Sequence, residues 1–195
     1  MRNLLIASVL AAGLSTSALA DNYDNTVLSM TAVSEKFTLS VKAPETGSQE
    51  YAISTDLGLV DGSITYLRNG ASDDWKARAG KEATLPAGPI DVYAGGGIAY
   101  KWGDSMANKT LTATPYVGVS KVIGVLTPYA EMGVDVQSNS TDWADFNRTD
   151  TYLEYGTNFN VNTTMSINLA IVEDRSVNFD TMEDRELNMG ITVKF

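Results

Sequence analysis

The 195-residue sequence contains no histidine and no cysteine, and only five prolines. Without histidine, Ser-His and Asp-His catalytic arrangements are excluded. Without cysteine, the chain has neither a disulfide framework nor a thiol nucleophile, and the usual nitrogen and sulfur ligands of transition metals are missing. A site of carboxylates alone, or a Ser-Lys pair, would need no histidine, but nothing in the sequence singles one out. We therefore predict no catalytic residues, no metal and no cofactor.

Long apolar runs are scarce, and the clearest one stands at the start of the chain. The apolar residues 4–14 follow Arg2 and precede Ala18-Leu19-Ala20, which is a small-residue cleavage pattern before Asp21. This arrangement is typical of a secretory signal peptide. No later stretch approaches the roughly 18 consecutive apolar residues of a membrane-spanning helix. The sequence therefore predicts a signal peptide at 1–20 and one exported domain at 21–195.

Positive charge is also in short supply. The formal net charge is −10, and it becomes −11 when the predicted signal peptide is removed, because Arg2 is the only charged residue in that segment. A protein that binds nucleic acid needs a basic surface for the phosphate backbone. We therefore expect no nucleic-acid partner.

The chain is rich in segments where apolar and polar side chains alternate. The last ten residues show this most clearly, with Leu187, Met189, Ile191, Val193 and Phe195 separated by polar or small residues. Successive side chains of a strand point to opposite faces, so this segment is a strand with one apolar face. Similar segments recur from Lys36 onward. The lead-in at 21–34 is ambiguous, because 27–33 fits either a strand extension or a loose arm.

The connections between these segments alternate between short and long. Short ones are expected near 61–62, 84–89, 121–124 and 162–163, and long ones near 44–50, 70–74, 102–109, 137–149 and 174–185. Short periplasmic turns that alternate with long extracellular loops are typical of outer-membrane barrels. An even number of strands would place both chain ends on the periplasmic side.

The leader, the two-faced strands, the alternating connections and the terminal Phe195 together resemble small bacterial outer-membrane β-barrel proteins of the OmpA/OmpX-like or porin-like kind. The resemblance implies an all-β fold, a closed antiparallel up-and-down transmembrane β-barrel of about ten strands. About eight strands would result if the third and fourth strands formed a loop hairpin. It also implies a location in the bacterial outer membrane, contact with its lipid, and Phe195 as an assembly signal for the barrel-assembly machinery. A secreted soluble β-sandwich is the alternative fold.

Charged residues opposite the apolar faces are expected to line the lumen of such a barrel. They are Lys36, Lys42, Asp56, Lys76, Arg78, Glu82, Asp91, Lys101, Glu131, Asp135, Glu154 and Lys194. Because both signs are equally represented, we expect ion pairs that brace a narrow interior. Barrels of about eight strands are filled by side chains, whereas open channels belong to barrels of roughly 16 to 18 strands.

Two functions follow from this interpretation. The first is a non-enzymatic barrel that is structural or passes small solutes. The second is a surface binding or adhesion protein that acts through the loops near 137–149 and 174–185. The sequence identifies no external ligand or receptor for the second function.

Overall fold

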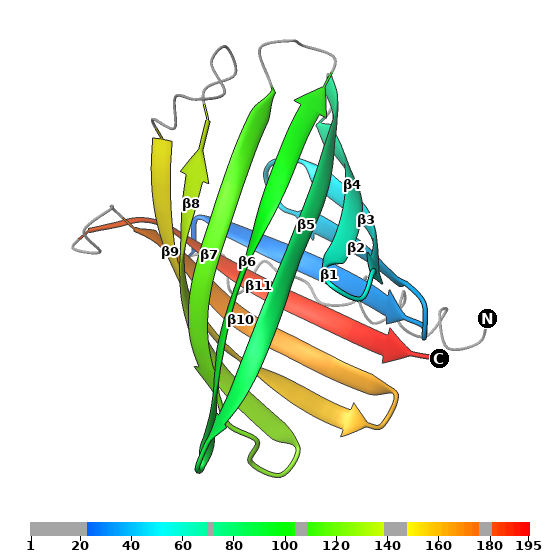
Figure 1. Cartoon of the computed structure of the whole chain (residues 1–195), viewed down its shortest axis with the longest axis vertical. Helices are drawn as coiled ribbons and strands as arrows, with labels where there is room; N and C mark the ends of the chain where they lie inside the picture. Colours follow the sequence, from blue (N-terminus) through cyan, green and yellow to red (C-terminus); the bar gives the residue numbers. More distant parts are fainter. Residues whose placement is uncertain (1–22, 70–71, 104–108, 139–147, 176–180) are drawn as a thin grey trace.

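The computed structural model describes residues 23–69, 72–103, 109–138, 148–175 and 181–195 (Figure 1). They form eleven strands: β1 (Asn25–Val33), β2 (Thr38–Pro44), β3 (Gln49–Asp56), β4 (Asp61–Asn69), β5 (Ser72–Ala87), β6 (Ile90–Gly103), β7 (Thr110–Ser120), β8 (Leu126–Gln137), β9 (Arg148–Asn162), β10 (Met165–Arg175) and β11 (Met182–Lys194). Each strand pairs with its neighbours along the chain, and β1 closes the ring by pairing with β11. The predicted closed all-β barrel is confirmed, and a single closed sheet excludes the β-sandwich. None of the described segments is a helix that would be able to cross a membrane.

The eleventh strand comes from the ambiguous lead-in. β1 lies between β2 and β11, antiparallel to β2 but parallel to β11, with Asn25 opposite Glu186 and Val33 opposite Lys194 (Figure 1). This seam is the one departure from the predicted antiparallel arrangement. It also overturns the expectation that both ends of the chain lie on one side, because β1 begins at the end of the barrel where β11 begins. The physical gain is closure, since β2 and β11 would otherwise each present an unpaired edge.

The third and fourth predicted strands are part of the wall, so the eight-strand alternative does not hold. They are β4 and β5, and β5 pairs with β6 from Asp74 to Ala87. The turn before β4 lies at 57–60 rather than at the predicted 61–62, and Gly58 adopts a positive φ of 87° there. The backbone amide of Gly58 donates to Asp56 Oδ1 (2.6 Å), which stabilises this turn. The turn predicted at 84–89 is shorter than expected, because β5 reaches Ala87 and only 88–89 connect it to β6, with Gly88 at a φ of 70°.

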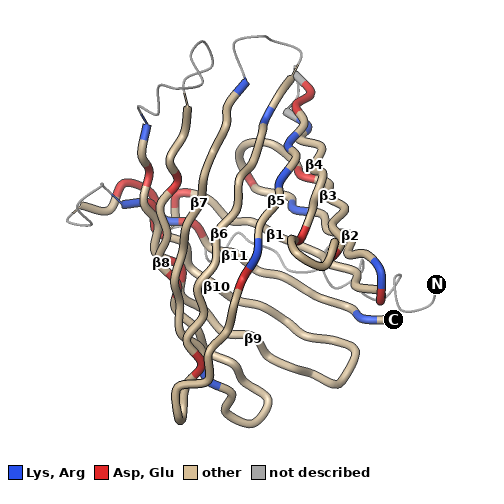
Figure 2. The backbone as a smooth tube through the Cα atoms, in the orientation of Figure 1, with Lys and Arg blue, Asp and Glu red and all other residues tan. Residues whose placement is uncertain are grey.

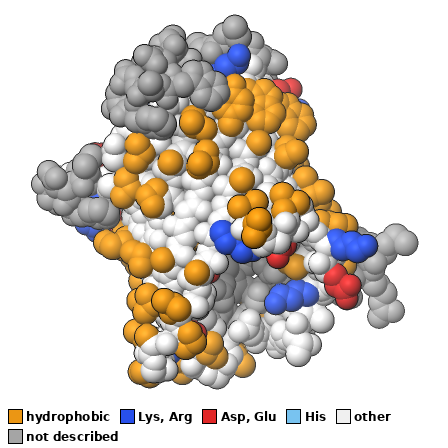
Figure 3. Space-filling view, viewed as in Figure 1, with side chains coloured by type: hydrophobic (Ala, Val, Ile, Leu, Met, Phe, Trp, Pro, Cys, Tyr) orange, Lys and Arg blue, Asp and Glu red, His pale blue; other side chains and the backbone are white. Residues whose placement is uncertain are grey.

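The two faces of the sheet differ in polarity. Large apolar side chains stay exposed on one face, such as Ile98 at 59% and Leu169 at 46% (Figure 3). On the other face, side chains meet across an intervening strand: the Tyr116 hydroxyl on β7 reaches past β6 to Glu82 on β5 (3.0 Å). Side chains converge in this way only on the concave side of a curved sheet. The apolar face is therefore the outer wall, and many of the charged positions along the strands in Figure 2 belong to the lumen.

Candidate functional site: the polar lumen

Tyrosine hydroxyls and glutamate carboxylates form the centre of the lumen. Tyr152 on β9 donates to Glu131 on β8 (2.8 Å), and Tyr129 on β8 donates to Glu154 on β9 (2.6 Å). Asn168 on β10 donates to the Tyr129 hydroxyl oxygen (3.1 Å), which extends the network to a third strand. Hydrogen bonds to an ionised acceptor are stronger than neutral ones. The network therefore holds these carboxylates in fixed positions without any basic partner.

The inward tyrosines depend on glycines in the neighbouring strands. Three rings lie directly over glycines: Tyr93 over Gly118, Tyr116 over Gly95, and Tyr152 over Gly133. A Cβ atom on Gly118 would lie 2.2 Å from the Tyr93 ring, so no other residue fits there without a shift of the ring. At Gly95 the absence of a side chain allows this close packing, because an added Cβ would lie 2.5 Å from the Tyr116 ring. The sequence interpretation missed the tyrosines, although the repeated Tyr-x-Gly spacing, at Tyr93 and again at Tyr116, was a usable signal.

Residues of like charge face each other across strand pairs in the lumen. The acidic pairs are Glu131 with Glu154, Asp135 with Asp150, and Asp174 with Asp184, and the basic pair is Lys76 with Lys101. Like charges directly opposite each other destabilise a sheet by fractions of a kcal/mol to about 1 kcal/mol per pair. Such pairs lower stability, so a contribution to stability does not explain why they are present. Positions where a sequence departs from what stability favours tend to be functional, so these like-charged pairs mark the lumen as the candidate site.

The basic side chains collect on β5 and β6. Lys76, Arg78 and Lys101 line a cavity of about 190 Å³ together with Asp135. The Lys101 ammonium forms an ion pair with Asp74 (3.1 Å). On the opposite side of the cavity, the Thr114 hydroxyl donates to Asp135. The lumen thus has an acidic wall on β8 and β9, whereas β5 and β6 carry these three bases alongside the acids Asp74, Glu82 and Asp91.

The twelve charged residues predicted for the lumen are placed as follows. Lys36 lies in the turn between β1 and β2, Lys42 on β2, Asp56 at the end of β3, Lys76, Arg78 and Glu82 on β5, Asp91 and Lys101 on β6, Glu131 and Asp135 on β8, Glu154 on β9, and Lys194 at the end of β11. Apart from Lys36, the alternation of each strand places them opposite its apolar face. Within the described part of the chain, no ion pair joins two of these twelve residues. The expected bracing pairs are replaced by tyrosine hydrogen bonds and by partners outside the set.

The same face carries more acid than the sequence interpretation counted. The register adds Glu50, Asp61, Asp74, Asp150, Asp174, Asp184 and Glu186 to the acids, but only Arg148 to the bases. Most of these residues had been assigned to loops or turns, because the strands are longer than the alternation indicated, and Glu186 had been placed on the last strand without being counted among the lumen charges. The expectation of a nearly balanced lumen is therefore overturned, and acidic side chains outnumber basic ones.

One mouth of the barrel is markedly acidic. A cavity of about 330 Å³ near the starts of β1 and β11 is lined by four acids and one base, with Asn25 beside them: Asp24, Asp174, Asp184, Glu186 and Arg185. The Asn25 amide donates to Glu186 (3.2 Å). Among the described residues, no group of three or more His, Cys, Asp or Glu side chains is placed to hold a metal ion. The acids of this mouth provide a negative field.

Comparisons with known proteins add little information about the function of this chain. The sequence matches no family model and no curated protein. Among solved structures, the anion-selective porin from Comamonas acidovorans aligns with 12% identity and a TM-score of 0.35, over 81% of this chain. The aligned part is 51% of the porin, so this chain spans about half of its length. At this identity and TM-score, the resemblance supports no conclusion about what this chain does.

Proposed function

We propose that the mature chain is a non-enzymatic outer-membrane β-barrel that passes small solutes and prefers cations. The observation that carries the proposal is the inverted polarity of the barrel, with apolar side chains outside and charged ones inside. In lipid, backbone polar groups must be satisfied internally, and a closed sheet meets that requirement. A water-soluble barrel would bury its apolar face, because large exposed apolar surfaces promote association.

The preference for cations follows from the lumen charges. Rings of acidic side chains select for cations by raising their local concentration in a confined space. Glu131 and Glu154 face each other at the centre, and Asp174 faces Asp184 toward one mouth. The tyrosine rings that lie over glycines narrow the same region, so we expect small conductance rather than porin-sized steps.

Several sequence expectations become part of this proposal. The signal peptide at 1–20 and most of the long loops lie outside the described residues, as do 139–147 and 176–180 of the two loops predicted to bind a surface ligand. Phe195 is described, and its backbone amide donates to the Val33 carbonyl (3.0 Å) while its side chain is 68% exposed. An exposed aromatic ring directly after β11 suits recognition by the assembly machinery during insertion.

Reconstitution in planar bilayers tests the function. Under a KCl gradient, the reversal potential should show cation selectivity with small current steps, and Glu131→Gln/Glu154→Gln should reduce that selectivity. Lys42→Gln, which removes a positive lumen charge on a distant strand, serves as the matched control and should leave cation selectivity intact or increase it. Anion selectivity, or recovery of the protein in soluble form without detergent, would contradict the proposal.

A further inference from the structure

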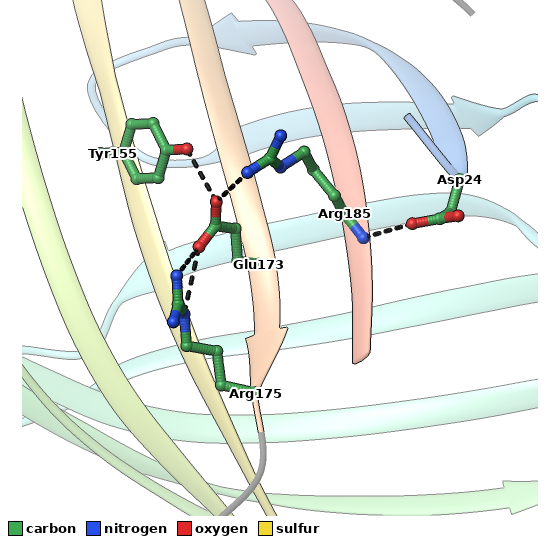
Figure 4. Close-up of polar contacts among 5 residues, drawn as sticks. All are labelled: Asp24, Tyr155, Glu173, Arg175 and Arg185. Atoms are coloured by element: carbon green, nitrogen blue, oxygen red, sulfur yellow. Dashed lines mark hydrogen bonds and ion pairs between the residues drawn. The ribbon is translucent and has the colours of Figure 1, made fainter. Parts of the chain in front are cut away.

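An ionic cluster lies on the outer face of the barrel, near the loop ends of β9, β10 and β11 (Figure 4). It consists of Tyr155, Glu173, Arg175 and Arg185, here called the rim cluster. Glu173 stands two and four residues after the outward-facing Ile171 and Leu169, so it shares their face of β10. Despite this position, Glu173 is only 2% exposed. A buried carboxylate on the outer wall has no role in the lumen.

Positive charge is in excess within the rim cluster. The Glu173 carboxylate is shared by both guanidiniums, with Arg185 Nη2 at 2.7 Å from Oε1 and Arg175 Nη2 bound to Oε2. The Tyr155 hydroxyl also donates to Oε1 (2.9 Å). Asp24, the nearest additional carboxylate in Figure 4, accepts from the backbone amide of Arg185 (2.7 Å) rather than from its guanidinium. Within the described residues, Arg185 Nε is buried and has no hydrogen-bond partner.

An apolar groove lies next to the rim cluster. It has a volume of about 530 Å³, and its lining includes the outward side chains of Leu169, Ile171 and Leu187. Tyr155 belongs to both features, because its ring lines the groove and its hydroxyl binds Glu173. The apolar groove therefore joins the rim cluster through Tyr155.

We propose that the rim cluster and this groove bind an anionic lipid, with its phosphate headgroup on Arg175 and Arg185 and an acyl chain in the groove. Guanidinium groups match phosphate oxygens in charge and in geometry, and they bind them in a bidentate manner. The phosphate would compete with Glu173 for the same donors. This inference rests on the proposed position in a membrane, where the loop ends of the strands lie at the level of the lipid headgroups.

Three nearby acids, Asp174, Asp184 and Glu186, point to the opposite, inner face of the same strands and do not line the groove. Arg185 also borders the acidic cavity that they line, so Arg175 is the guanidinium outside that cavity. The side chains of Arg175 and Arg185 are 26% and 35% exposed, which leaves part of each accessible to a ligand. Charge complementarity therefore favours a phosphate-bearing lipid over a neutral one.

Lipid retention by the purified mature protein tests the proposal. Native mass spectrometry of the detergent-solubilised protein would compare phosphatidic acid with a diacylglycerol of the same chains and with inorganic phosphate. We expect phosphatidic acid to be retained, diacylglycerol to be retained about tenfold less or not at all, and inorganic phosphate not to compete at millimolar concentration. Equal retention of the two lipids would overturn the proposal, and so would a stable dimer that excludes the lipid.

Three variants separate binding from a structural role. Arg185→Gln should lower retention of phosphatidic acid about tenfold, whereas Glu173→Gln should raise it because the competing carboxylate is gone. Arg68→Gln is the matched control, since Arg68 is exposed at the loop end of β4, away from the groove. If Arg185→Gln does not fold, Arg175→Gln takes its place. A loss of retention in Glu173→Gln, or an equal loss in Arg68→Gln, would refute the site.

The same preparation distinguishes this inference from the proposed function. A protein that needs detergent but shows no phosphate preference would refute the lipid site alone. A protein that stays monomeric and soluble without detergent would refute the membrane placement, and the lipid site with it.

Discussion

The identities of several lumen residues are explained by the side chains on neighbouring strands rather than by the sequence of their own strand. Glu131 faces Glu154, and each carboxylate accepts a hydrogen bond from a tyrosine instead of forming an ion pair. Tyr93 lies over Gly118 because glycine alone leaves room for its ring. Tyrosine rings that cover strand glycines restore the packing that glycine lacks, a device also used in designed sheets. At this scale, the glycines are explained by the tyrosine rings that pack on them from the neighbouring strand, and the glutamates by the negative charge that they give the lumen.

Gly118→Ala tests this fit. The new Cβ would lie 2.2 Å from the Tyr93 ring, so the ring must move, and we expect a loss of about 1–3 kcal/mol in the free energy of unfolding. Urea titration in detergent or lipid vesicles would measure it. Gly96→Ala is the control. Its added Cβ would meet no aromatic ring, and the nearest atom to it would be the Thr114 carbonyl oxygen at 3.3 Å. Equal loss in both variants would show that the Tyr93 contact is not the cause.

The alternation of apolar and polar residues predicts the faces of the strands, but it does not predict how long the strands are or which strands pair. Alternation predicted the outer faces of β6 to β11 well, because every second residue there is apolar. It underestimated the loop ends of β9, β10 and β11, where Asp150, Asp174 and Asp184 extend the ladders. These ends are polar on both faces, so period two is lost although the backbone pairing continues. Strand length there is determined by the neighbouring strand.

The two faces of β10 should respond differently to the same substitution. Leu169→Arg places a charge on the outer wall, and we expect it to cost about 2–4 kcal/mol at the bilayer midplane. Asn168→Arg, one residue away, points into the lumen near the Tyr129 hydroxyl and the acidic wall, so it should be milder. Folding titration into lipid vesicles measures both. Equal damage would mean that the inside and outside of this strand have been exchanged.

At the scale of the whole molecule, the barrel is closed by the parallel pairing of β1 with β11. Eleven strands with β1 parallel to β11 place the first strand's beginning and the chain's end at opposite ends of the barrel. Bacterial single-chain barrels usually have an even number of strands, whereas an odd number is known from a mitochondrial barrel. The seam is a continuous ladder, from Asn25 with Glu186 to Val33 with Lys194. Closure of the barrel therefore depends on β1, a segment that the predicted ten-strand barrel did not include in its wall.

Accessibility of tags tests this topology. An epitope tag placed directly before Tyr23 in the mature chain should be labelled on intact cells, because β1 begins at the end that carries the long loops. A tag inserted in the turn between β9 and β10, at 163–164, should be labelled only after permeabilisation. If both tags require permeabilisation, β1 does not occupy the seam as described. Labelling of both on intact cells would instead indicate a mixed orientation.

The sequence alone determined that two-faced strands fill the chain from Lys36 onward, which face of each strand is apolar, and where the connections from β5 to β11 lie to within a few residues, because these properties depend on residues one to four positions apart. Only the tertiary structure decided that Asn25–Val33 completes the wall, that Glu131 meets Glu154, and that Glu173 is buried on the outside. Period two leaves the register between strands open, and register alone brings together residues far apart in the chain. The acidic lumen, the tyrosine–glycine contacts and the rim cluster all depend on that register.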